Sequence, residues 1–257
     1  MKETFFPNKI IHIIGVLFAS LLLAMPFFFF VGVNSNTGSE LHQTIFFVLV
    51  CFVFIGITYW INYRKKQRLN WNFKFVNNRL LYLMLVLLFA FSVGINKPVN
   101  NFIEQILQNE TEISNPFNRP FFAIGAVLIA PILEEIIFRG IILRGLLTRY
   151  SPKYAIVFSA LIFGLIHGKP LQIWGAFVTG LILGWIYYKT QSIGTTILLH
   201  SFLNLTVLLT NYLLFRYTIL DSLTLHIFLL VVSIPVIYLA AKHLISKLNT
   251  VKNEKTN

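Results

Sequence analysis

The sequence predicts an all-α membrane protein, a polytopic bundle of about eight transmembrane helices with both termini in the cytoplasm. Three observations predict this class. Of the 257 residues, 56% are hydrophobic and only 12% are charged, and the apolar residues fall into eight runs joined by polar, often basic links. A soluble domain has about twice that charged fraction. Because a bilayer core of about 30 Å takes roughly 20 apolar residues per helix, the chain has room for seven or eight spans and no separate soluble domain.

The eight apolar runs are the predicted spans. In chain order they cover about residues 10–33, 44–63, 80–95, 121–150, 154–167, 171–188, 194–215 and 223–241. The first is longer than a signal-peptide core and lacks a small-residue cleavage site, so we expect it to be retained. Between the third and fourth spans lies the longest outer loop, residues 96–119. There Phe102, Ile103, Ile106 and Leu107 recur at helical spacing after Asn100 and Asn101, which predicts a short interfacial helix.

The whole chain, residues 1–257, is predicted to be one membrane domain with three parts. Residues 1–119 hold the first three spans and the outer loop, residues 120–215 hold spans four to seven, and residues 216–257 hold the last span and a basic tail. The first three spans contain almost no ionisable residue, whereas spans four to seven do. We therefore expect the chemistry in residues 120–215.

The basic residues predict the orientation. The formal net charge is +12, and Lys and Arg gather in the link between spans two and three, at the join between spans four and five, and after span eight, whereas the first link has none. These residues are Arg64, Lys65, Lys66, Arg68, Lys74 and Arg79; Arg144, Arg149 and Lys153; and Lys242, Lys247, Lys252 and Lys255. Their distribution favours cytoplasmic loops of a plasma-membrane protein over a nucleic-acid surface. The abundance of Phe, Asn, Ile and Lys further suggests a bacterial source.

Four ionisable residues within the predicted spans stand out, Glu134, Glu135, His167 and His200, and Asn204 joins them as a buried amide. An ionisable residue inside a span costs a few kcal/mol on insertion scales, so each is a candidate for function. Cys51, the only cysteine, lies in an apolar run, which excludes an internal disulfide and a cysteine metal cluster.

The two adjacent glutamates of the fourth span point about 100° apart on a helix, so they are expected to have different roles. Glu135 and Arg139 are four residues apart and suit an ion pair that orients rather than stabilises. Glu134 has no local cation and suits a general base. The alternative is that both carboxylates reach the interface or bind lipid. Pro131 predicts a kink that opens backbone groups toward the site.

The remaining three polar residues suit the same site. His167 ends the fifth span, and His200 and Asn204 share one face of the seventh, where each could also serve in helix packing. If all converge, a carboxylate activates water, an imidazole holds it, and a His/Asn pair donates to the oxyanion. Alternatively Glu134, His167 and His200 bind zinc with an open position for water, although no HExxH motif is present.

In order and type, these residues resemble the motifs of the CAAX-protease and bacteriocin-processing family, also called the abortive-infection family. Glu134, Glu135 and Arg139 match EExxxR; Phe163 and His167 match FxxxH; His200 and Asn204 match HxxxN. The resemblance implies an eight-span intramembrane endopeptidase. It also implies that Glu134 activates water with His167 as partner, that Glu135 pairs with Arg139, and that His200 and Asn204 form the oxyanion site. Family members have been described both as metalloproteases and as glutamate-type proteases, so the resemblance leaves zinc as a possible cofactor.

The predicted function is hydrolysis of a peptide bond in a membrane-associated peptide or protein, with the lipid bilayer as the second partner. Bacterial peptide maturation or bacteriocin processing and immunity fit the resemblance best. One alternative is a non-catalytic membrane scaffold or immunity protein that binds another membrane protein. A small transporter with a proton relay is a third, but it would favour an internal repeat, and none is found in the sequence.

Overall fold

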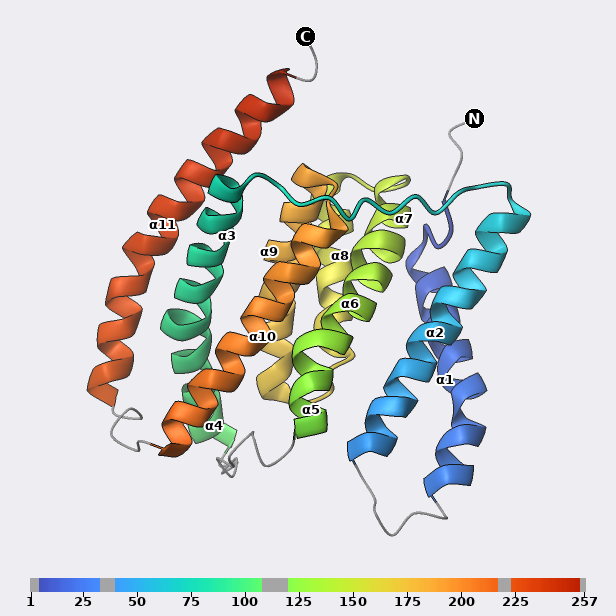
Figure 1. Cartoon of the computed structure of the whole chain (residues 1–257), viewed down its shortest axis with the longest axis horizontal. Helices are drawn as coiled ribbons and strands as arrows, with labels where there is room; N and C mark the ends of the chain where they lie inside the picture. Colours follow the sequence, from blue (N-terminus) through green and yellow to red (C-terminus); the bar gives the residue numbers. More distant parts are fainter. Residues whose placement is uncertain (1–4, 33–39, 108–119, 217–222, 255–257) are drawn as a thin grey trace.

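The computed structural model describes residues 5–32, 40–107, 120–216 and 223–254, and these residues form eight continuous helices and no strand (Figure 1). Six of them are α-helical throughout: α1 (Ile10–Gly32), α2 (Glu40–Arg64), α8 (Pro152–Leu165), α9 (Pro170–Thr190), α10 (Ile193–Arg216) and α11 (Leu223–Glu254). Two contain wider, π-type turns, labelled η: α3 (Asn78–Phe91), η1 (Ser92–Asn96) and α4 (Lys97–Leu107); and α5 (Pro120–Ile124), η3 (Gly125–Ile129), α6 (Ala130–Glu135), η4 (Ile136–Leu143) and α7 (Arg144–Leu147). We call the second of these, residues 120–147, the motif helix.

The predicted spans lie close to the observed helices, with two differences. The third helix does not stop before a separate interfacial helix but continues through η1 into α4. The last helix runs to Glu254, so most of the predicted basic tail is helical. Residues 108–119 of the predicted outer loop lie outside the described residues. Both differences have one cause: polar residues can continue a helix once it leaves the bilayer, and hydrophobicity alone cannot detect that continuation.

Five of the described helices are long and apolar enough to cross a membrane by length and composition: Ile10–Phe29, Leu41–Arg64, Asn78–Ile103, Ile193–Leu213 and Thr224–Leu248. A further apolar helix, Pro152–Leu165, is shorter. Many large apolar side chains of α1 and α11 are exposed, Phe18 and Val231 among them, which suits contact with lipid. The chain is therefore an all-α polytopic membrane protein.

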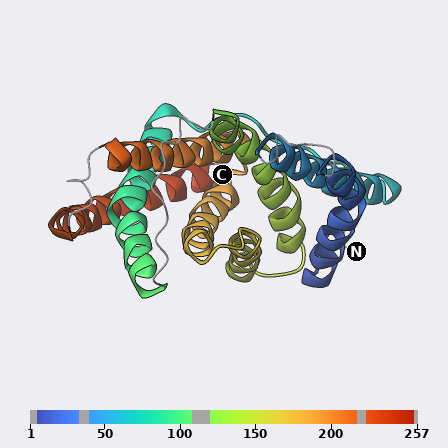
Figure 2. The ribbon, with the colours of Figure 1, turned by 90° about the horizontal axis from the view of Figure 1, so that it is seen from below.

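The helices are arranged around the motif helix. α1 packs on α2 at one edge of the molecule, α3 packs on α11 at the other, and α8 and α9 lie side by side between them (Figures 1 and 2). α1 begins and α11 ends at the same end of the bundle, as an even number of crossings requires. The cytoplasmic assignment of that end stays a prediction.

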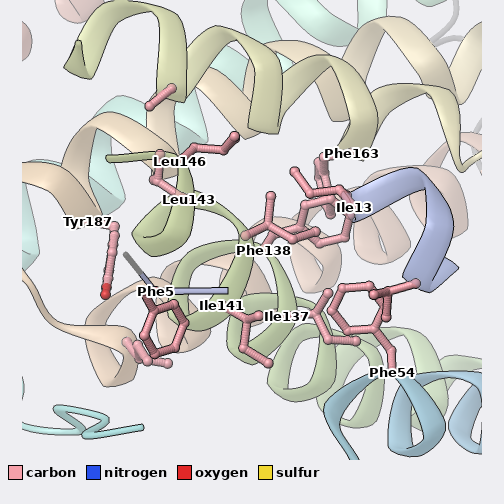
Figure 3. Packing of buried hydrophobic residues seen from close by; sticks show 14 of the residues in the cluster. Phe5, Ile13, Phe54, Ile137, Phe138, Ile141, Leu143, Leu146, Phe163 and Tyr187 are labelled. Carbon is pink, nitrogen blue, oxygen red and sulfur yellow. The ribbon is translucent and has the colours of Figure 1, made fainter. Parts of the chain in front are cut away.

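The motif helix is also the centre of the larger core. Phe138, Ile141, Leu143 and Leu146 are buried within it, and side chains of α1, α2 and α8 pack around them (Figure 3). A second cluster joins α3, α9, α10 and α11. The site residues are therefore carried by elements that apolar packing holds on both sides.

Small residues bring α8 and α9 into close contact. A Cβ atom added to Gly180 would lie 3.0 Å from Ala160, and one added to Gly184 would lie 3.3 Å from Ile156. Small residues four apart let helix backbones approach within a membrane, where packing rather than hydrophobicity drives association. This contact fixes the position of Phe163 on α8 relative to the Gly180 backbone on α9.

Candidate active site

The centre of the site is a buried ion pair on the motif helix. Arg139 Nη1 donates to Glu135 Oε1 over 2.7 Å, and both side chains are almost fully buried. Arg139 Nη2 also approaches the Gly180 carbonyl oxygen at 3.4 Å. The spacing of four residues places both groups on one helix face, and the close approach of α9 provides the third contact.

His200 of α10 lies between the two glutamates. Its Nδ1 is 2.9 Å from Glu135 Oε1, and its Nε2 is 3.8 Å from Glu134 Oε2. A carboxylate only accepts hydrogen bonds, so the contact with Glu135 assigns the proton to Nδ1 and turns Nε2 toward Glu134. The arrangement orients an imidazole by one carboxylate and presents its other nitrogen to a second carboxylate.

The two carboxylates differ in access. The Glu134 side chain is 11% exposed, whereas that of Glu135 is 0% exposed and already accepts from Arg139 and His200. Glu134 therefore keeps a small accessible surface, while Glu135 is already bonded to two neighbours. Glu134 is the carboxylate of this pair that is suited to chemistry.

Phe163 of α8 connects the site residues from three helices. Its ring lies 5.0 Å from the Arg139 guanidinium, 5.0 Å from the His167 ring and 5.7 Å from the His200 ring. Figure 3 shows it beside Phe138, with ring centroids 4.9 Å apart. A guanidinium over an aromatic face is a favourable contact, most of all when water is excluded. Sequence reasoning used Phe163 only to match a motif and assigned it no role.

His167 is held at the end of α8. Its Nδ1 lies 2.7 Å from the Phe163 carbonyl oxygen, four residues earlier, and its ring packs edge-on against the Phe163 ring. The carbonyl oxygen can only accept, so Nδ1 donates to it and Nε2 is left for other partners. His167 is thus fixed in rotamer and tautomer and connected to His200 through Phe163.

Asn204 bonds to the motif helix one turn beyond His200. Its Nδ2 donates to the Ala126 carbonyl oxygen over 2.7 Å. That oxygen needs a partner because Ala130 N–H bonds to Gly125 in the wide turn η3, and the next residue, Pro131, has no N–H. Pro131 therefore leaves one backbone carbonyl group, that of Ala126, without a helical partner, and Asn204 donates a hydrogen bond to it.

The structure thus brings Glu134, Glu135, Arg139 and His200 into direct contact. His167 contacts the Phe163 ring, and Asn204 bonds to the backbone of the motif helix before the glutamates. Of the two residues predicted to share one face of α10, His200 bonds a carboxylate and Asn204 bonds a carbonyl group of the motif helix.

The zinc alternative requires Glu134, His167 and His200 to converge on one point. In the part of the chain that the structure describes, no three His, Cys, Asp or Glu side chains converge as a metal-binding group. Glu134, His167 and His200 as arranged do not fit a three-ligand zinc site.

Comparison with known proteins identifies the family of this segment. Residues 116–206 match the model of a family described as type II CAAX prenyl endopeptidase Rce1-like. The segment that carries the motifs is therefore similar to this family. The Rce1-like segment contains every site residue described above, and the family predicted from the motifs is confirmed for it.

Two curated proteins extend the likeness. The chain is 27% identical over 222 residues to UPF0177 protein YaiF of Lactococcus lactis subsp. lactis (strain IL1403), covering 79% of this chain and 97% of YaiF. It is 34% identical over 92 residues to "Putative membrane peptidase YdiL" of Bacillus subtilis (strain 168), covering 35% of this chain and 37% of YdiL. No solved structure matches the chain. These comparisons relate the chain to a family of membrane proteases.

Proposed function

We propose that this protein is an intramembrane endopeptidase in which Glu134 activates the water that attacks a peptide bond. The observation that carries the proposal is the position of His200, bonded to the buried Glu135 and facing Glu134 at 3.8 Å. One water molecule can contact two atoms at that separation within ordinary hydrogen-bond distance of about 2.8 Å. The pair therefore suits binding and deprotonation of a single water.

The proposed reaction uses only residues of this chain. Glu134 takes one proton from the water while the water oxygen attacks the carbonyl carbon of the substrate. The negative charge that develops on the carbonyl oxygen is stabilised by hydrogen bonds, and the proposed donors are His200 Nε2, when protonated, and the second amide hydrogen of Asn204. Glu134 then passes the proton to the leaving nitrogen, so the products are one carboxylic acid and one amine.

Glu135 and Arg139 are proposed as positioning residues. The carboxylate that accepts from Nδ1 holds the imidazole in one tautomer, as in other carboxylate–histidine pairs. Arg139 balances the charge of Glu135, and Phe163 fixes Arg139. His167, held by the Phe163 carbonyl group, is proposed as a further polar contact for water or substrate beside Glu134.

The proposed substrate is a peptide or protein at the membrane of a bacterial cell. The two matched relatives come from Lactococcus and Bacillus, and one is named as a peptidase. Maturation of secreted peptides, including bacteriocin processing or immunity, is the proposed setting.

The deciding experiment compares the wild type with Glu134→Gln in detergent, using a peptide library and mass spectrometry to read cleavage. A general base contributes about 10²- to 10⁴-fold, so we expect Glu134→Gln to lose at least 100-fold in rate. Glu104→Gln, the same change on α4, is the matched control and should cleave like the wild type. A chelator arm tests the metal dependence of the same cleavage.

His200→Ala is the second arm, with His226→Ala as its control because both histidines are buried. We expect only His200→Ala to abolish cleavage while both proteins keep their helical circular dichroism. Cleavage by Glu134→Gln at the wild-type rate would contradict the mechanism. A biological phenotype that survives both Glu134→Gln and His200→Ala would support the scaffold alternative instead.

A further inference from the structure

An extended segment crosses the end of the bundle where α1 begins and α11 ends. Residues 67–77, which we call the strap, join α2 to α3 and run past the ends of the motif helix and α10 (Figure 1). α2 ends where Lys66 takes a left-handed conformation, with φ of 58°, and Gln67 N–H bonds back to the Asn62 carbonyl oxygen. This C-terminal cap turns the chain out of the helix and into the strap.

The backbone of the strap is bonded to the bundle along its length. Ile193 N–H donates to the Asn72 carbonyl oxygen over 2.8 Å, and Val76 N–H donates to Thr195 Oγ1 over 3.1 Å. Ser192 Oγ donates to the carbonyl oxygen of residue 74, and Arg144 Nη1 donates to that of residue 70 over 2.9 Å. The strap is therefore a fixed surface element rather than a loose connection.

The side chains of the strap divide into an inner and an outer set. Trp71 turns inward, where its Nε1 lies 3.1 Å from the position that a Cβ atom of Gly140 would take. Phe73 and Phe75 are 49% and 61% exposed, and Arg68 and Lys74 are exposed beside them. Exposed Phe rings beside Lys and Arg suit a membrane–water interface, where the rings meet the acyl chains and the cations meet the headgroups.

The charge around the strap has one sign. Six basic residues lie between positions 64 and 79, and the sequence has no Asp or Glu between Glu40 and Glu104. Two of the six have aromatic partners within the protein: Arg64 lies over the Trp60 ring and Lys65 over the Phe6 ring. Arg68 and Lys74 are therefore the cations of the strap best placed to meet an external anion.

We propose that the strap binds the headgroups of anionic phospholipids in the leaflet at this end of the bundle. It lies beside the ends of the spanning helices, where headgroups are the nearest anions, and clustered Lys and Arg next to a span attract them. Phe73 and Phe75 would enter the interface between the headgroups and the acyl chains. Because Trp71 contacts Gly140, next to Arg139, and the strap bonds to the start of α10, bound lipid would also hold the two helices that supply Glu135 and His200.

Native mass spectrometry of the purified full chain tests this proposal independently of any protease activity. Binding of dioleoyl phosphatidylglycerol is titrated against dioleoyl phosphatidylcholine, which has the same acyl chains and no net charge. Each Lys or Arg near the surface contributes about a fivefold preference, so Arg68→Gln with Lys74→Gln should weaken phosphatidylglycerol binding about 25-fold. Lys97→Gln with Lys169→Gln removes the same charge at the other end of the bundle and should leave that binding unchanged.

Arg68→Lys with Lys74→Arg keeps the charge at the strap and should bind phosphatidylglycerol like the wild type. This variant separates loss of charge from loss of folding, and circular dichroism of all three double variants checks their helicity. Equal binding of the two lipids by the wild type would overturn the proposal. Equal weakening by the two Gln pairs would overturn it as well, because the preference would then follow net charge and not the strap.

Discussion

At the scale of single residues, Glu135 organises the polar contacts of the site without being accessible to substrate. It accepts from Arg139 and His200 within a core that excludes water. Removing one partner from a buried ion pair typically costs 3–5 kcal/mol, because the other charge is left unpaired. Arg139 bonds to Glu135 and not to Glu134, one residue earlier. In the proposed mechanism, adjacent positions on one helix thus separate the positioning of the site from its chemistry.

Phe163 holds the site together at the same scale, because its ring contacts a cation and two imidazoles at once. Phe163→Leu keeps an apolar side chain but loses the contact with the Arg139 guanidinium, which is worth about 2 kcal/mol when water is excluded. We expect a larger loss of stability than in Phe54→Leu, an equally buried phenylalanine of the same core whose ring contacts no charged group in the described structure. We also expect cleavage to fall in Phe163→Leu alone.

Thermal unfolding in detergent and cleavage of an identified peptide are the two measurements. Since both variants lose a buried ring, the difference between them isolates the contacts with Arg139, His167 and His200. Equal unfolding temperatures and equal cleavage rates in the two variants would show that Phe163 only fills space.

At the scale of elements, two wide turns precede prolines in the same way. η1 ends two residues before Pro98, and η3 ends two residues before Pro131. The wide turn accommodates the ring and the missing N–H of proline without ending the helix. Sequence alone predicted that Pro131 opens backbone groups, but not which residue bonds to them, because Asn204, the partner of the Ala126 carbonyl group, comes from a helix more than 70 residues later.

The sequence predicts features that follow from local patterns, but not contacts between distant segments. Helix positions follow from apolar runs, so all eight predicted spans begin within four residues of an observed helix. The pairing of His200 with Glu135 depends on the tilt of α10, and the path of the strap has no periodic pattern. Neither is encoded by local spacing, and both required the tertiary structure.

The contact of the strap with α10 supports an element-scale prediction. A Cβ atom at Gly194 would lie 2.2 Å from the Phe73 carbonyl oxygen, so Gly194→Ala must displace the strap or the start of α10. We expect destabilisation of about 1–3 kcal/mol, the usual cost of overpacking. Gly56→Ala, on α2 with nothing within 4 Å of the added atom, is the matched control and should be neutral or slightly stabilising.

Thermal unfolding of the two alanine variants measures the difference, and limited proteolysis locates it. Cleavage within residues 67–77 should accelerate in Gly194→Ala only. An unfolding temperature for Gly194→Ala equal to that of Gly56→Ala would contradict close docking of the strap.

At the scale of the whole molecule, charge and architecture agree. The basic links, the strap and the ends of α1 and α11 lie at one end of the bundle, whereas Glu40 and Glu104 belong to helix ends at the other. The buried site lies between the two ends, within the apolar part of the motif helix. The positive-inside rule assigns the strap end to the cytoplasm.

Cysteine labelling tests this orientation, and the single natural cysteine makes the experiment simple. Cys51 is buried, and Cys51→Ala gives a background without thiols. Gln43→Cys and Lys74→Cys then place one exposed thiol near each end of the bundle. A membrane-impermeant maleimide added to intact cells should modify Gln43→Cys, and Lys74→Cys only after lysis. The reverse pattern would put six basic residues of the strap region outside, against the rule that predicts the topology, and would move the proposed lipid surface to the outer leaflet.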